Sequence, residues 1–241
     1  MILGLRSWPK DNYLFMAGSV VCFVWILVAV FSYQIVPYDP LAQDLERRFE
    51  PPSFVHWFGT DTLGRDIFSR VIVGSRLSLT AGIITVLIAG TIGSLFGAVA
   101  GYFGGLIDDI MMRISEMVMA FPAIILAMTI TAALGPSLYN TILAMVIVSW
   151  PNYARVMRSM VIYIKQNEYV DASRALGASE SRTMFVEVLP NSLGPVIVMG
   201  TLDLGNAILI FSGLSFLGLG APPPNPEWGA MVADGMQNFG Y

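Results

Sequence analysis

Apolar residues occur in long runs along the chain, and short polar segments separate these runs. A helix needs about 20 apolar residues to cross the roughly 30 Å hydrocarbon core of a membrane. Backbone groups in lipid must find partners within their own segment, so we predict that each run of this length forms a helix. The predicted spans run from about Tyr13 to Val36, Leu77 to Tyr102, Ile114 to Leu134, Leu138 to Met160 and Leu193 to Leu217.

The first of these runs follows Arg6 and Lys10, as the apolar part of a signal peptide would. Its apolar stretch is longer than the roughly 7 to 15 residues of a cleavable signal. We therefore expect an uncleaved anchor. The pattern as a whole predicts an all-α fold, a polytopic membrane helix bundle with five spans.

Small residues and prolines add detail to this bundle. Lipid offers no hydrophobic drive between helices, so small residues that let two backbones approach are typical of packed membrane helices. Such residues recur every four positions on one face of the second predicted span, at Gly93, Gly97, Gly101 and Gly105. We predict close helix packing along this face. Pro122 and Pro151 lie inside the third and fourth spans, where they should kink or interrupt the helix.

Composition agrees with a membrane protein and excludes several other classes. Apolar residues make up 55% of the chain and charged residues 12%, whereas soluble domains carry about 25% charged residues. The net charge of −4 argues against nucleic acid as a partner. Cys22 is the only cysteine and His56 the only histidine. An internal disulfide is therefore excluded, and so are most metal sites and histidine-based catalytic schemes.

The basic residues predict an orientation. Loops on the cytoplasmic side carry an excess of Lys and Arg, and a cytoplasmic N-terminus satisfies this rule. It places segment 37–76 outside the cell and loop 164–192 in the cytoplasm, between the fourth and fifth spans. The cytoplasmic basic residues are then Arg6, Lys10, Arg113, Arg155, Arg158, Lys165, Arg174 and Arg182, against Arg47, Arg48, Arg65, Arg70 and Arg76 outside.

The stretch "EYVDASRALGASESRTMFVEVLPN", residues 168–191, is a polar segment between two apolar spans. Gly177 is placed to end a first short helix in a left-handed cap. Ser179 can cap a second helix, with Glu180 in its first turn. Pro190 marks the point where we expect this second helix to give way to the next span.

One face of the first short helix carries little bulk, because it presents Ala172, Ser173 and Ala175, and Ala178 continues the small residues beyond the glycine. Such a face lets another protein surface come close. Arg174 and Arg182 are the exposed charges that can fix the register of that partner. The alternative on the residues alone is a solvated connection between two spans.

"DASRALG" followed by "VLP" resembles the EAA motif of the permease subunits of bacterial ATP-binding-cassette (ABC) importers. Asp171, Ala172 and Ser173 take the first three positions of the motif. Further along, Gly177, Leu189 and Pro190 match it directly, whereas Glu187 stands where the general pattern has a hydrophobic residue.

Three more stretches resemble one branch of that superfamily, the dipeptide, oligopeptide and nickel permeases. They are "FGTDTLGRDIFSRVIVGSRLSL" (58–79), "AGYFGGLIDDIMMRISEMVMAFP" (100–122) and "GLSFLGLGAPPPNPEWGAMVADG" (213–235). The resemblance covers about residues 37–240. It implies that residues 1–241 form a single transmembrane domain of the type I importer fold, with a sixth span expected beyond residue 241. A divergent form with five spans is the alternative.

The resemblance also implies a function and a set of partners. Loop 164–192 would be the coupling element that docks on an ATPase subunit, through Glu168, Asp171, Ala172, Ser173, Arg174, Ala175, Gly177, Ala178, Arg182, Leu189 and Pro190. The assembly in the bacterial inner membrane would hold a second homologous permease, two ATP-binding subunits with their ATP and Mg, and an extracytoplasmic substrate-binding protein. This chain would bind no cofactor, and it has no G-x-x-x-x-G-K-[ST] phosphate loop. Dipeptides, longer peptides and chelated nickel remain open as cargo, and no residue of the substrate path is assigned.

Two other classes of function have some support in the sequence, an ion-driven transporter and an enzyme. Charges inside membrane spans usually pair or line a wet cavity, so Glu116, Asp203 and Arg155 could form the relay of an ion-driven transporter. A structural salt bridge for these residues or for Arg158 is equally open. An enzyme is disfavoured, because "GLSFLG" (213–218) lacks the second glycine of G-x-S-x-G. No catalytic residue and no metal site is assigned.

Overall fold

The computed structural model describes residues 13–238. Helices account for most of this range, which contains no β-strand, only an isolated bridge between Thr60 and Asp66. Contacts divide the chain into two units. The first comprises residues up to Leu79 together with Pro224–Trp228 and the segment from Asp234, and the second comprises Thr80–Pro223 with Gly229–Ala233.

The first unit contains α1 (Tyr13–Val30), α2 (Ser32–Ile35), the short η1 (Leu45–Arg47) and the beginning of α3 (Ile67–Phe103). Polar contacts hold the segment that precedes α3. His56 Nδ1 lies 2.8 Å from an Asp66 carboxylate oxygen, and the other oxygen accepts a hydrogen bond of 2.8 Å from the backbone N–H of Ser69. Asp66 therefore satisfies a free donor at the start of α3, as an N-terminal cap does.

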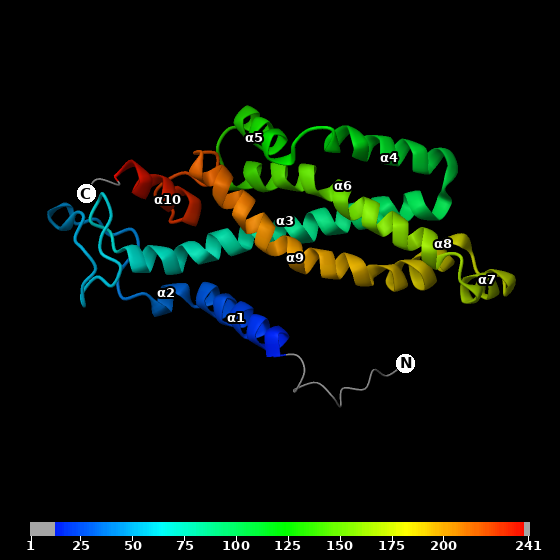
Figure 1. Ribbon diagram of the computed structural model, residues 1–241, viewed down its shortest axis with the longest axis horizontal. Helices are drawn as coiled ribbons and strands as arrows, with labels where there is room; N and C mark the ends of the chain where they lie inside the picture. The colour runs from blue at the N-terminus through cyan, green and yellow to red at the C-terminus, as the bar shows by residue number, and fades with distance from the viewer. Residues whose placement is uncertain (1–12, 239–241) are drawn as a thin grey trace. The chain divides into compact units, whose positions relative to one another are not determined.

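The second unit is a bundle around one central helix. It contains the rest of α3, then α4 (Gly105–Met119), α5 (Ala123–Leu134), α6 (Leu138–Ile164), α7 (Glu168–Ala175), α8 (Glu180–Arg182), the π-helix η2 (Thr183–Val188) and α9 (Leu189–Phe216). Among the described residues, α10 (Trp228–Gln237) follows α9. Within this unit α6 packs against α4, α5 and α9 (Figure 1).

The glycine face of α3 lies against α6. A Cβ atom added at Gly93, Gly97 or Gly101 would lie closer than 3.0 Å to backbone oxygens of α6, those of Trp150, Ala154 and Arg158 respectively. The two backbones are thus in direct contact at these positions, as the four-residue spacing predicts. Gly105 departs from the prediction. With Gly104, it adopts a positive φ and turns the chain from α3 into α4, so the register of α3 has already ended.

The apolar helices differ in number and form from the five predicted spans. Three helical stretches of the described residues are long and apolar enough to cross a membrane: Tyr13–Val30, Ile67–Phe103 and Glu180–Phe216. The third predicted span is broken, because α4 and α5 meet at an angle of 83° next to Pro122; taken as one bent span, this pair makes a fourth. Pro151 does not break α6, which continues through it.

The remaining predicted span, α6, has 27 residues but is not among the helices that are apolar enough to cross a membrane. Polar residues such as Asn152 and the charged Arg155 and Arg158 interrupt its apolar sequence. Other helices of the bundle surround much of α6. A helix in that position faces protein more than lipid and tolerates polar residues that a lipid-facing helix does not.

Candidate functional site

The first helix of loop 164–192 has the bounds that its capping residues predict. α7 runs over Glu168–Ala175 and ends at Gly177, which has a φ of +86°. The Gly177 N–H donates to Arg174 O at 2.9 Å, and the Ala178 N–H donates to Ser173 O at 3.2 Å. These bonds satisfy carbonyls at the helix end, and the positive φ favours glycine. The left-handed cap is confirmed.

The second helix of the loop begins as predicted at Ser179, whose hydroxyl accepts a hydrogen bond of 3.3 Å from the backbone N–H of Arg182. It does not give way at Pro190. Helical structure continues from Glu180 to Phe216, and the expectation of a break at Pro190 is wrong.

The helix continues through Pro190 because of the local backbone geometry. The π-helix η2 widens the turn just before the proline, so that the Leu189 N–H bonds to Met184 O, five residues back. Pro190, which has no N–H to donate, occupies the first turn of α9, where a donor is not needed.

The surface of the loop carries small residues and several exposed apolar side chains, of which Leu176 is the most exposed. Exposed positions include Glu168, Asp171, Ala172, Ala175, Gly177, Arg182 and Pro190, and half-buried ones include Ser173, Ala178 and Leu189. Leu176, at the end of α7, is 90% exposed. Leu176 was not among the residues predicted for this surface. Its exposure leaves it available for contact with a partner.

The inner side of α7 is fixed to the bundle. Val170 is fully buried, and α7 packs on η2. The Arg174 guanidinium donates to the Tyr102 hydroxyl at 3.3 Å and lies 3.9 Å from the Glu180 carboxylate. Tyr102 also donates to Glu180, and the guanidinium lies over the Tyr102 ring.

This contact set, Tyr102 with Arg174 and Glu180, is named the loop anchor here. It joins α7 and α8 to the C-terminal end of α3. The hydrogen bond that Arg174 donates to the Tyr102 hydroxyl raises the pKa of Arg174, so the guanidinium stays charged. Arg174, predicted as an exposed charge, is half-buried and held by these contacts within the chain. Its partner Tyr102 is 72 residues away in sequence, and no local pattern indicates the pairing.

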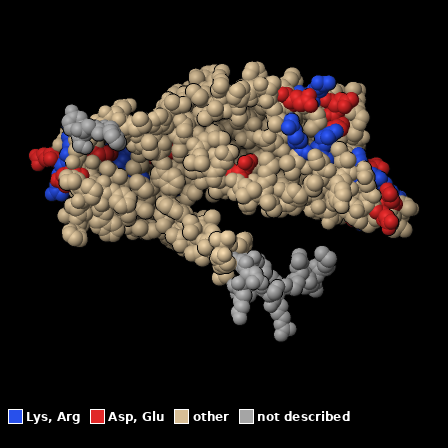
Figure 2. Space-filling view, in the orientation of Figure 1, with Lys and Arg blue, Asp and Glu red and all other residues tan. Residues whose placement is uncertain are grey.

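Charged residues of the second unit gather at the end formed by α7, α8 and the adjoining ends of α4 and α6, whereas its middle is almost uncharged (Figure 2). A partly buried pair lies there: Arg158 on α6 donates two hydrogen bonds to Asp108 on α4. Lys165 Nζ donates to Gly101 O at 2.7 Å. These contacts tie the same ends of α3, α4 and α6 together.

The proposed ion relay does not assemble. Glu116 pairs with Arg113 at 3.5 Å on the exposed surface, and it lines one cavity together with Arg155. Asp203 lines a different cavity, between α3, α6 and α9. A proton or ion path through these three residues would need them in one place.

Two family profiles match the chain. One, described as "Binding-protein-dependent transport system inner membrane component", matches residues 93–241, and the other, "N-terminal TM domain of oligopeptide transport permease C", matches residues 10–52. The chain belongs to the family of binding-protein-dependent transport system inner membrane components.

Curated relatives agree with this assignment. The probable D,D-dipeptide transport system permease protein DdpC of Escherichia coli is 46% identical over 94% of this chain and 76% of its own length. The dipeptide transport system permease protein DppC of Alkalihalophilus pseudofirmus is 43% identical over 95% and 75%, respectively. The oligopeptide transport system permease protein OppC of Bacillus subtilis is 40% identical over 96% and 76%.

Family membership settles the class of function. This binding-protein-dependent permease is a multi-pass protein of the inner membrane with the type I importer fold, a transport subunit of an ABC importer and not an enzyme. Transport of this kind involves ATPase and substrate-binding partners. Neither the family nor the separated positions of Glu116 and Asp203 support the ion-gradient alternative.

Proposed function

We propose that this permease forms half of the translocation path of a peptide importer, and that loop 164–192 couples the path to ATP hydrolysis on a partner subunit. The names of the relatives support the cargo, because they are permeases for dipeptides and oligopeptides. The observation that carries the coupling role is the two-sided construction of α7. Its outer side exposes Leu176, and its inner side is held by the loop anchor.

The physical sequence of coupling follows from this construction. Leu176 and the small residues around it dock in an apolar cleft of an ATP-binding subunit. Closure of the ATP-binding subunits then moves α7. Because Arg174 and Glu180 hold Tyr102, the end of α3 moves with it, and the glycine face transfers this motion to α6. A ligand that binds two states unequally shifts the population between them, and ATP acts here through the partner.

The proposed assembly places the N-terminus and loop 164–192 in the cytoplasm and segment 37–76 outside, as the excess of basic residues favours. A second homologous permease completes the path. Two ATP-binding subunits carry the ATP and Mg, and an extracytoplasmic binding protein delivers the peptide. Chelated nickel receives no support from the relatives, whose names refer to peptides.

Replacement of Gly177 by valine tests the coupling role. Gly177 has a φ of +86°, which a β-branched residue does not adopt without strain, so the variant should distort the exposed end of α7. We expect peptide uptake by the complete assembly to fall at least about tenfold, while membrane insertion and basal ATPase activity persist.

Gly135→Val is the matched control, since Gly135 also has a positive φ of +91° and open space around it, but lies between α5 and α6. Wild-type uptake by Gly177→Val, or an equal loss in both variants, would contradict the coupling role.

A further inference from the structure

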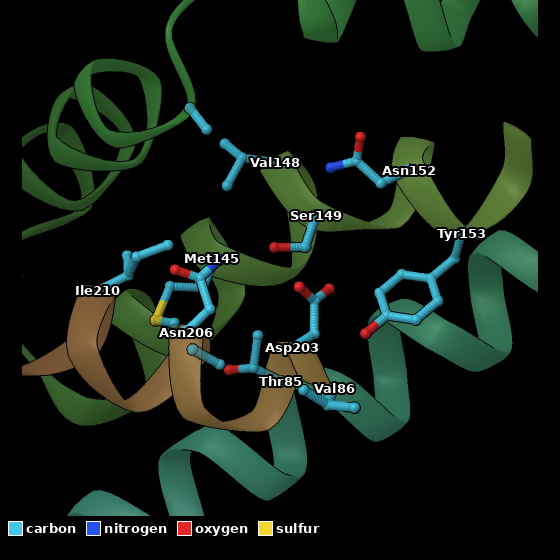
Figure 3. Close-up of a pocket in the computed structure, with 12 residues that line it drawn as sticks. Thr85, Val86, Met145, Val148, Ser149, Asn152, Tyr153, Asp203, Asn206 and Ile210 are labelled. Atoms are coloured by element: carbon cyan, nitrogen blue, oxygen red, sulfur yellow. The ribbon is translucent and has the colours of Figure 1, made fainter. Parts of the chain in front are cut away.

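A polar cavity lies among the apolar helices of the second unit, where α3, α6 and α9 meet. Its volume is about 90 Å³. A single water needs roughly 10–15 Å³ by this measure, so the cavity holds several waters or one small polar group. Asp203 and Asn206 of α9 share its wall with Ser149, Asn152 and Tyr153 of α6 (Figure 3).

The carboxylate of Asp203 has no cation beside it. It projects into the cavity toward Ser149 and Tyr153 (Figure 3), and the lining contains no Lys, Arg or His. A charge in a membrane bundle is unfavourable unless it is paired or hydrated. Asp203 is half-buried, and Asn152 and Asn206 beside it are exposed, so the cavity opens to the surface of this chain.

Two buried hydroxyl groups add to the polar lining of the cavity. Tyr153 and Thr85 both line the cavity, and their side chains are only 1% exposed. The Thr85 hydroxyl has no hydrogen-bond partner within the described chain, whereas the Tyr153 hydroxyl lies beside the Asp203 carboxylate. Buried polar groups are nearly always satisfied, and an exception calls for an absent water, ion or ligand. The cavity thus offers a negative charge together with several polar groups, among them the unpartnered Thr85 hydroxyl.

We propose that this cavity binds the N-terminal ammonium group of a peptide in transit, with Asp203 as its counter-ion. The inference rests on the proposed function as a peptide importer. A primary ammonium carries the charge that Asp203 needs and donates three hydrogen bonds, which the carboxylate and the amide oxygens of Asn152 and Asn206 accept.

Recognition of the ammonium suits a transporter of many peptides. The α-amino group has an ordinary pKa of about 7.7–8.0, so most unmodified peptides carry it charged at neutral pH whatever their side chains are. A neighbouring cavity beside α9 is mostly apolar, and its lining includes Val86, Leu193 and Leu204. One charged contact with apolar surroundings would hold the shared end of the peptide without selecting its sequence.

Uptake by the complete assembly tests the role of Asp203. Wild-type import of radiolabelled dialanine establishes that the system is a peptide importer, and failure at this step would contradict the proposed function itself. Given wild-type import, we expect Asp203→Asn to reduce uptake at least about tenfold, the effect of one lost charge-assisted hydrogen bond. Asp109→Asn, which removes an exposed charge from α4, should stay within about twofold of wild type. Wild-type uptake by Asp203→Asn would overturn the ammonium site and leave the importer function standing.

The rate of thiol labelling tests the same site without a transport measurement. Ile210 also lines the cavity, and Ile210→Cys places a thiol there in a background where exposed Cys22 is replaced by alanine. Cationic aminoethyl methanethiosulfonate should label this thiol about tenfold faster than the anionic sulfonatoethyl reagent, and Asp203→Asn should remove the preference. Dialanine amide, which carries the ammonium, should slow labelling. Its N-acetyl derivative, or sodium chloride at the same concentration, should not. Equal protection by all three, or by none, would overturn the proposal.

Discussion

At the scale of single residues, the loop anchor is the contact set on which the proposed coupling depends most. Tyr102 contributes its hydroxyl to Arg174 and Glu180 and its ring face to the same guanidinium. Partly buried charge-assisted hydrogen bonds of this type are stronger than neutral ones. Since the three residues lie on α3, α7 and α8, the anchor holds both helices of the loop to the same end of a long span.

Tyr102→Phe removes the hydroxyl and keeps the ring. We expect peptide uptake per ATP hydrolysed to fall about three- to tenfold. Arg174 loses the hydroxyl to which it donates, and Glu180 loses the hydroxyl from which it accepts. Tyr163→Phe is the control, since the Tyr163 side chain is 67% exposed on α6, and it should change this ratio by less than about twofold. An unchanged ratio in Tyr102→Phe would show that the anchor does not carry the movement.

At the scale of elements, neighbouring residues predicted the ends of the short helices correctly. They did not predict contacts between helices that are distant in sequence. The cap at Gly177 and the start at Ser179 depend on a few neighbouring residues, and both were read correctly from the sequence. The spacing of Gly93, Gly97 and Gly101 identified a packed face, but Gly105 extended the pattern past the helix end.

Two other errors have a similar origin. The π-turn of η2 lets the helix continue through Pro190, which no simple rule for proline indicates. Arg174 looked exposed because its partner Tyr102 comes from a distant helix. The cavity around Asp203 likewise unites residues of α3, α6 and α9, so the sequence could single out the carboxylate but not its surroundings.

The contact between α3 and α6 yields a stability prediction. In Gly97→Ala the added methyl group would lie closer than 3.0 Å to the backbone of Ala154, so the helices must separate. We expect a loss of about 1–3 kcal/mol in the free energy of unfolding, the usual effect of overpacking. Gly18→Ala in α1 has open space and should be neutral or slightly stabilising. Thermal unfolding of both variants in detergent provides the measurement, and equal midpoints would contradict direct backbone contact.

At the scale of the whole molecule, two features of the second unit matter for the proposed transport: the charged end with α7 and α8, and the cavity. Exposed and charged groups gather at the end with α7 and α8, where a motor subunit would act. The polar cavity lies deeper in the bundle, where α3, α6 and α9 meet, and a peptide would bind there. α3 connects the two, because Tyr102 near its end belongs to the loop anchor and Thr85 lines the cavity. In the proposed mechanism, movement of the loop would reach the cavity through this one continuous helix.

Site-specific crosslinking in inner-membrane vesicles tests this account most directly. Leu176→Cys and Leu45→Cys, each in the Cys22→Ala background, place single thiols on the exposed loop and on the exposed segment 37–76. The account predicts that the Leu176→Cys variant crosslinks to an ATP-binding subunit in an ATP-dependent manner and that the Leu45→Cys variant does not. Labelling of the Leu176→Cys thiol only from the extracytoplasmic side, with no crosslink to an ATP-binding subunit, would contradict it.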